Sequence, residues 1–127
     1  MLDMAYTRLR TAVNRVKYAR IENMRHRQEL DVYQQWFNNN KVHLKSSTVS
    51  LLEDLITAAG SMVAEADAKL QDYVASLETR DREKIRSQAK VLDKVRSGKR
   101  EAMTELMQTL KSSWNKEAKQ TDFVTFA

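Results

Sequence analysis

The feature that most constrains the fold of this chain is a seven-residue repeat of apolar and small residues near its start. One position of the repeat is occupied by Leu2, Leu9, Val16, Asn23, Leu30 and Phe37, and the position three residues later by Ala5, Ala12, Ala19, His26 and Tyr33. Residues with this spacing lie along one side of an α-helix. The repeat therefore predicts a helix over about residues 2–37 that packs lengthwise against another helix.

A second repeat of the same length follows. Its two positions are occupied by Val49, Ile56, Val63, Leu70 and Leu77, and by Leu52, Ala59, Ala66 and Tyr73. Three asparagines at 38–40 favour an end to the first helix, because asparagine tolerates left-handed backbone angles. Serines at 46, 47 and 50 offer N-caps, and the spacing from Ser50 to Glu53 is that of a capping box. The sequence predicts a second helix over about 46–78 and an antiparallel hairpin.

The hairpin also predicts which residues face each other. Folding the chain about residue 41 places Ala12 opposite Leu70 and Ala19 opposite Val63, so that small residues meet large ones. Asn23 and His26 then form a polar layer opposite Ala59 and Ile56, of the kind that fixes helix register at some cost in stability.

A third helical pattern covers about residues 81–117. Its apolar positions are Ile85, Ala89, Leu92, Val95, Ala102, Met103, Leu106, Met107, Leu110 and Trp114. The repeat slips between Leu77 and Ile85, which favours a turn at 78–81; the alternative is one long helix that ends at Gly98. In the three-helix layout Trp36 and Trp114 lie at the same end of the rod.

Composition supports this fold class. The chain has no proline and two glycines in 127 residues, so little interrupts helices. We therefore predict an all-α domain over residues 1–118, either an elongated antiparallel helical hairpin or a three-helix bundle with coiled-coil-like packing, followed by a tail at 119–127. The absence of cysteine, of a long apolar run and of a signal-peptide pattern favours a cytoplasmic or other reducing intracellular compartment.

Motifs that carry chemistry are missing from the sequence. HExxH, CxxC, a glycine-rich phosphate loop and a nucleophile elbow do not occur, so we expect no enzyme, no cofactor and no small-molecule substrate. His26 has Glu22 and Glu29 on nearby helical turns, but the second predicted helix supplies no further histidine. We interpret His26 as part of the polar layer rather than as a metal ligand.

Charge is distributed unevenly along the chain. The net charge is +4 over 1–41, −4 over 42–79, +6 over 80–100 and −1 over 101–127. Within the basic block, residues 82, 86, 90 and 94 follow one another at intervals of four and form one ridge on a helix. We predict an anion-binding or partner-binding surface made of Arg80, Arg82, Lys84, Arg86, Lys90, Lys94, Arg96, Lys99 and Arg100. A solvated face that carries no function is the competing interpretation.

The tail contains a short apolar group formed by Phe123, Val124 and Phe126. It either folds back onto the bundle or serves as a docking segment. These features favour a non-enzymatic structural or interaction subunit that presents helical faces to itself or to a larger assembly. A non-specific nucleic-acid-binding protein that uses the basic ridge is the alternative, and an anionic membrane surface is a less favoured partner.

Overall fold

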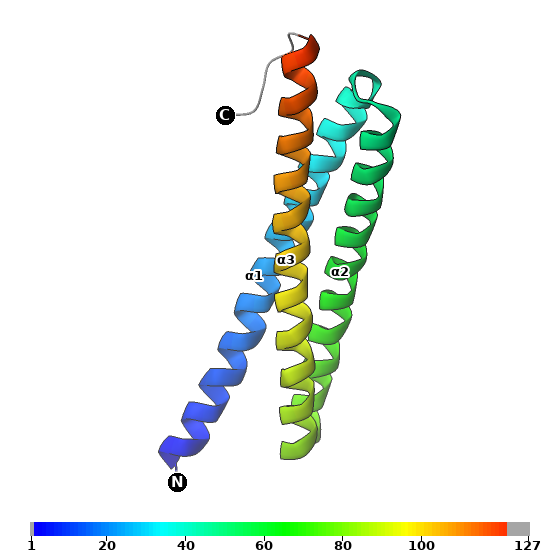
Figure 1. Cartoon of the computed structure of the whole chain (residues 1–127). Coiled ribbons are helices and arrows are strands. Elements are labelled where there is room, and N and C mark those ends of the chain that lie inside the picture. Colours follow the sequence, from blue (N-terminus) through cyan, green and yellow to red (C-terminus); the bar gives the residue numbers. More distant parts are fainter. Residues whose placement is uncertain (1, 122–127) are drawn as a thin grey trace.

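The computed structural model of this chain describes the backbone of residues 2–121 and the side chains of residues 6–117. It contains three long helices, α1 (Leu2–Asn40), α2 (Ser46–Thr79) and α3 (Arg82–Thr121), with a short 3-10 helix η1 (Lys41–His43) after α1. The helices run up, down and up along a rod, and the N-terminal half of α1 diverges from the other two (Figure 1). The predicted all-α class is confirmed. Over this described part, no helix has an apolar stretch long enough to cross a membrane.

The turn between α2 and α3 lies within the predicted segment 78–81, so the alternative of one unbroken helix is wrong. Arg80 has a left-handed backbone with φ 57°. The side-chain Oδ1 of Asp81 accepts hydrogen bonds from the backbone N–H groups of Glu83 (3.1 Å) and Lys84 (3.3 Å). A left-handed residue followed by an aspartate N-cap ends one helix and starts the next without glycine or proline.

The core lies mainly between α2 and α3, which pack along their whole lengths. The second repeat lines it, and the residues of α2 that are buried are Leu52, Ala59, Val63, Ala66, Leu70, Tyr73 and Ser76. On α1 no described side chain before Ala19 is buried, although the half-buried Val16 packs against the same core cluster as Ala19. Leu9 occupies a repeat position and is nevertheless 63% exposed.

The register of the hairpin differs from the prediction by about one heptad. Ala19 packs with Leu70 and Tyr73 rather than with Val63, and the Asn23 amide donates to Asp67 over 2.8 Å. The cause is the position of the reversal: α1 continues through Asn40, and η1 extends the chain further before α2 begins. The repeat identifies which side chains face the seam, but the length of the connection sets which ones meet.

Helix α2 does not begin with the predicted serine cap. It starts at Ser46 after Lys45, and no side chain caps it locally. The carboxylate of Glu117 in α3 instead accepts hydrogen bonds from the backbone N–H of Lys45 (3.0 Å) and from the hydroxyl of Thr48. A carboxylate at a helix N-terminus is electrostatically favourable, so Glu117 ties the end of α3 to the start of α2.

The two tryptophans confirm the three-helix layout. Trp36 of α1 and Trp114 of α3 lie with ring centroids 5.2 Å apart at an interplanar angle of 88°. Edge-to-face packing of this kind stabilises the fold beyond what burial of the two rings contributes. Phe37, Leu52 and Leu110 form the adjacent core cluster, so this end of the rod is closed by side chains from all three helices.

Candidate partner-binding groove

The other end of the rod is open. Here α1 diverges from α2 and α3 (Figure 1), and its side chains from Tyr6 to Val16 are exposed or half-buried. The space between the helices is a groove of about 1050 Å³. Its lining on α1 extends from Thr7 to Ile21, which corresponds to about 21 Å at 1.5 Å per residue.

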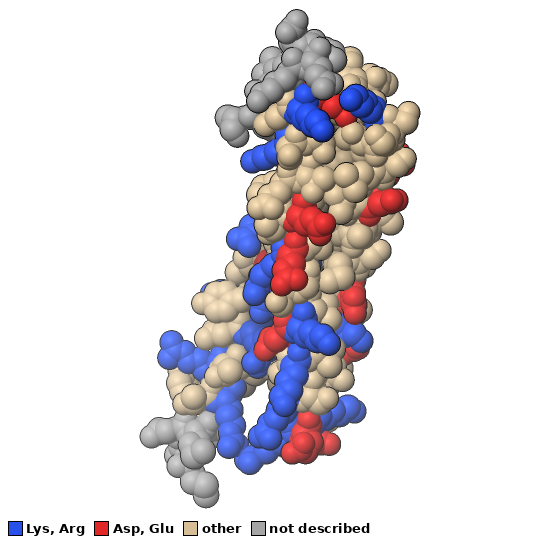
Figure 2. Space-filling model, in the orientation of Figure 1, with Lys and Arg blue, Asp and Glu red and all other residues tan. Residues whose placement is uncertain are grey.

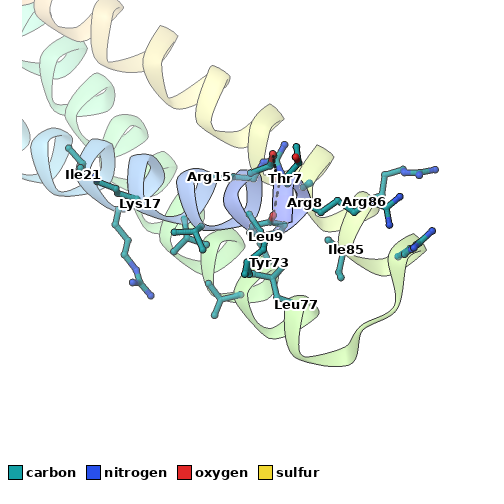
Figure 3. A pocket seen from close by; sticks show the side chains of 18 residues that line it. Thr7, Arg8, Leu9, Arg15, Lys17, Ile21, Tyr73, Leu77, Ile85 and Arg86 are labelled. Carbon is teal, nitrogen blue, oxygen red and sulfur yellow. Dashed lines mark hydrogen bonds between the residues drawn. The ribbon is translucent and has the colours of Figure 1, made fainter. Parts of the chain in front are cut away.

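The wall of the groove is largely apolar. Tyr73, Leu77 and Ile85 approach it from the ends of α2 and α3 that meet at the turn, and Leu9 faces them from α1 (Figure 3). Val13, also in the lining, is 55% exposed. Along this part of α1 the repeat position Leu9 and the neighbouring Val13 are therefore open to solvent, and the repeat positions Ala12 and Val16 are half-buried.

The groove also carries a high positive charge. Its lining contains six cationic side chains and no carboxylate: Arg8, Arg15, Lys17, Arg20, Arg82 and Arg86. Only two of these six pair with a described carboxylate, Arg15 with Asp93 at 3.5 Å and Arg86 with Glu83 at 4.0 Å. Figure 3 shows Arg8 and Arg86 at the same end of the groove, contributed by α1 and α3. On the face drawn in Figure 2, Lys and Arg side chains gather over this open half of the rod.

Arg15 connects the wall of the groove to the core. Its guanidinium carbon lies 5.4 Å from the ring centroid of Tyr73, and it donates to the Tyr73 hydroxyl over 3.2 Å. The contact with Asp93 of α3 adds an ion pair. Arg15 therefore contacts both other helices at the level where α1 leaves them, and Tyr73 is buried beneath it.

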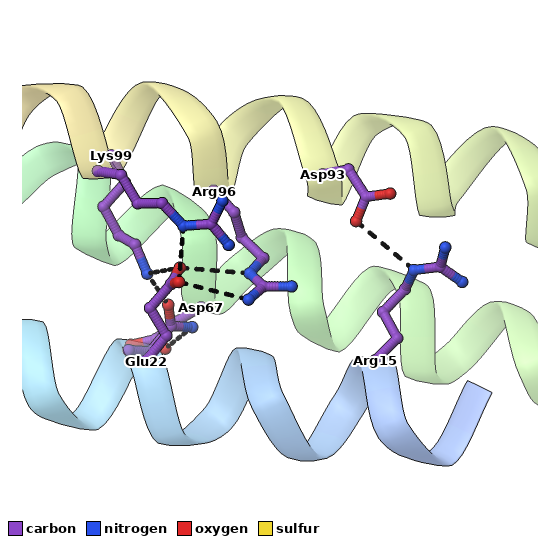
Figure 4. A network of polar contacts seen from close by, with 8 residues as sticks. Arg15, Glu22, Asp67, Asp93, Arg96 and Lys99 are labelled. Atoms are coloured by element: carbon purple, nitrogen blue, oxygen red, sulfur yellow. Dashed lines mark hydrogen bonds and ion pairs between the residues drawn. The ribbon is translucent and has the colours of Figure 1, made fainter. Parts of the chain in front are cut away.

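A buried polar network closes the inner end of the groove. Glu22 of α1 accepts contacts from three cations of α3, Arg96 (3.3 Å), Lys99 (3.0 Å) and Arg100 (2.7 Å), as Figure 4 shows for the first two. Burial alone would raise the pKa of Glu22, but hydrogen bonds from these cations outweigh it and lower the pKa from 4.5 to about 2. The network joins α1 to α3 where the two helices converge.

The same network extends to α2. Lys99, which is 0% exposed, also donates to the side-chain oxygen of Asn23, and Asp67 of α2 accepts from Asn23 and Arg27. Burial lowers the pKa of Lys99, although the neighbouring Glu22 acts in the opposite direction. The predicted polar layer thus exists at this level, with partners other than those predicted.

His26 lies one turn further along α1. It is buried, and its Nδ1 has no hydrogen-bond partner. Burial lowers the pKa of His26, and the charge of Lys99 lowers it further, so the neutral form is favoured. Within the described residues no group of three or more His, Cys, Asp or Glu side chains is placed to hold a metal ion.

The structure divides the predicted basic surface into three parts. Arg82 and Arg86 line the groove, whereas Arg80, Lys84, Lys90 and Lys94 are exposed outside its lining. The prediction is wrong for Lys99, which is fully buried; Arg96 and Arg100 contact Glu22, and the side chain of Arg100 is still 52% exposed. The predicted docking residues Phe123, Val124 and Phe126 lie outside the described residues.

Sequence reasoning missed the cations of α1. Arg8, Lys17 and Arg20 lie at least sixty residues from the basic block, and only the fold brings them to the same groove as Arg82 and Arg86. The charge of the first 41 residues was a signal, because most of its positive excess falls on the first helix.

Comparison of the chain with protein-family models, with curated proteins and with solved structures found no match.

Proposed function

We propose that this protein is a non-enzymatic interaction subunit that binds a protein partner in the groove at the open end of its rod. The observation that carries the proposal is the pairing of exposed apolar side chains, Leu9 and Val13, with positive charge alone in a single concave surface. Exposed apolar side chains that cluster beside polar rims mark interaction sites more often than isolated ones do.

The function can be tested by photo-crosslinking in the organism that makes the protein. A photoreactive phenylalanine analogue is placed at Val13, in the groove, and in a second preparation at Val42, which is 79% exposed on η1 at the closed end. We expect a discrete protein adduct from position 13 and none of that size from position 42. Equal adducts from both positions, or none from position 13, would exclude the groove as the interaction site.

A second candidate function, non-specific nucleic-acid binding, is favoured by one observation. Cations from α1 and α3 lie at the same end of the rod, so phosphates can contact two helices at once. The apolar wall argues against it, because a phosphate backbone gains nothing from Leu9 or Val13. A nuclease-sensitive adduct from position 13 would support the nucleic-acid function and replace the protein partner. So would duplex-DNA binding that weakens steeply with salt and disappears in the Arg82→Gln, Arg86→Gln variant.

A further inference from the structure

Resting on the proposed function, we infer that the groove binds an acidic amphipathic α-helix of another protein, seated beside α1 as a fourth helix at the open end. The inference has three parts: the occupant is a helix, its apolar side faces α1, and its flanks carry carboxylates. Each part follows from a different property of the groove.

The helical part follows from the repeat on α1. Leu9, Ala12 and Val16 continue the same seven-residue spacing that is buried against α2 further along α1, from Ala19 to Phe37. Before Ala19 the spacing is intact but only partly covered, since Leu9 is 63% exposed and Ala12 and Val16 are half-buried. Residues at this spacing pack against the side chains of a neighbouring helix. A length of about 21 Å admits about four turns of one.

The apolar part follows from the size of the seam residues. Ala12 is small and half-buried, and it lies in the lining between the larger Leu9 and Val16. A leucine or isoleucine of the partner fits opposite an alanine, since layers fill when large faces small. Leu77 and Ile85, which are half-buried, provide the opposite wall against which such side chains pack.

The acidic part follows from the six cations that line the groove without a carboxylate among them. Arg8, Lys17, Arg20 and Arg82 make no ion pair with any described residue. Carboxylates on both flanks of a seated helix reach these cations, as charged flanks do in coiled coils. Charge complementarity of this kind governs the choice of partner and the association rate.

The same charges disfavour the other occupants. In a two-fold symmetric dimer through this surface, the groove of one copy would face that of the other, so the like charges would repel. A flat anionic bilayer reaches the cations on the rim but not Leu77 and Ile85, which are half-buried in the wall between the helices. A helix seated in the groove can contact the cations of the rim and the apolar residues of the wall at the same time.

The test uses synthetic peptides and the full chain. The probe is a fluorescein-labelled peptide of 21 residues with leucine at both seam positions of three heptads and glutamate at the flanking positions. One control peptide has lysine in place of glutamate, and a second has the acidic composition in an order that destroys the seam. Fluorescence anisotropy at nanomolar probe measures binding and limits self-association of the peptides.

We expect saturable binding of the acidic peptide that is at least tenfold tighter than binding of either control. Raising sodium chloride from 50 to 500 mM should weaken it several-fold. Val13→Glu should weaken it at least tenfold, whereas Val42→Glu at the closed end should leave it unchanged. Substituting Arg8, Arg82 and Arg86 together by glutamine should weaken binding and flatten its salt dependence. Circular dichroism of each variant checks that the helices remain.

Several results would overturn the inference. Absence of saturable binding, or equal binding of the acidic, basic and shuffled peptides, rejects a specific acidic helix. Binding of phosphatidylglycerol vesicles that Val13→Glu abolishes, without peptide binding, assigns the groove to anionic lipid. A dimer in sedimentation that Val13→Glu dissociates assigns it to a second copy. If position 13 crosslinks to a protein while the acidic peptide fails, the proposed function stands and only this inference falls.

Discussion

Removal of the buried charge of Glu22 is the sharpest test of how α1 is held against α3. Glu22→Gln keeps the size and shape of the side chain and removes the carboxylate that contacts Arg96, Lys99 and Arg100. Lys99 stays fully buried in the variant unless the helices separate. The substitution therefore leaves a buried cation without its counter-charge.

The expected loss follows from the shift in pKa. The pKa of Glu22 falls from 4.5 to about 2, and each unit corresponds to about 1.36 kcal/mol. The carboxylate thus contributes about 3 kcal/mol to the free energy of unfolding at neutral pH. This agrees with the roughly 3–5 kcal/mol found when one partner of a buried ion pair is removed.

The sign of the pH dependence is fixed by the same shift. Because the folded-state pKa is depressed, the contribution is complete above pH 4.5 and is lost as the pH falls toward 2. At pH 3 about 1.4 kcal/mol remains. Urea unfolding followed by circular dichroism should therefore show the wild type and Glu22→Gln separated by about 3 kcal/mol at pH 7 and by about half of that at pH 3.

A matched control is Glu65→Gln, since Glu65 is exposed on α2 and makes no ion pair with a described residue. Its effect should stay within about 0.5 kcal/mol at every pH. If Glu22→Gln costs less than 1 kcal/mol, or if its difference from wild type does not narrow in acid, the account of the network is refuted.

Three further substitutions test local features by the same unfolding assay. Gly60→Ala should stabilise by about 0.5–1 kcal/mol, because a Cβ at Gly60 meets nothing within 4 Å and alanine favours the helix; a loss would contradict the open space there. Arg80→Gly should stabilise by roughly 0.5–1 kcal/mol by relieving the left-handed backbone, and no gain would refute that strain. Ala19→Leu should destabilise by about 1–3 kcal/mol by overpacking the core, whereas Val13→Leu, in the open groove, should cost less than about 0.5 kcal/mol. Equal effects at 19 and 13 would show that α1 does not open where the structure places it.

The helices and the seam of α2 were predictable because they rest on local information. Every turn of α2 repeats the pattern, and the residues at its repeat positions are buried or half-buried. The turn at Arg80 and Asp81 was predictable from a slip in the repeat. Its cap by the Asp81 side chain is also local and could have been recognised.

Lys99 shows where a prediction made from the charge of a segment alone fails. Lys99 was assigned to the exposed basic surface, yet it stands seven residues after Leu92 and seven before Leu106, both fully buried. That spacing marks a seam position and was available in the sequence. Its partner Glu22, however, lies 77 residues earlier, and no local pattern indicates that the two meet. Similarly, nothing near Ser46 indicates that Glu117 supplies its cap.

The open half of α1 could not be predicted from the repeat, and the reason bears on function. A seam of Leu9, Ala12 and Val16 requires a covering helix, but periodicity does not say whether that helix belongs to the same chain. The network at Glu22 lies at the boundary between the covered and the open half. An apolar layer at that level would be equally stable or more so, and it would allow α1 to slide along α3. A carboxylate contacted by three cations at one height restricts such sliding, and it thereby fixes how far α1 stands from the wall formed by Tyr73 and Ile85. On this argument the polar layer sets the shape of the groove as well as the register of the bundle.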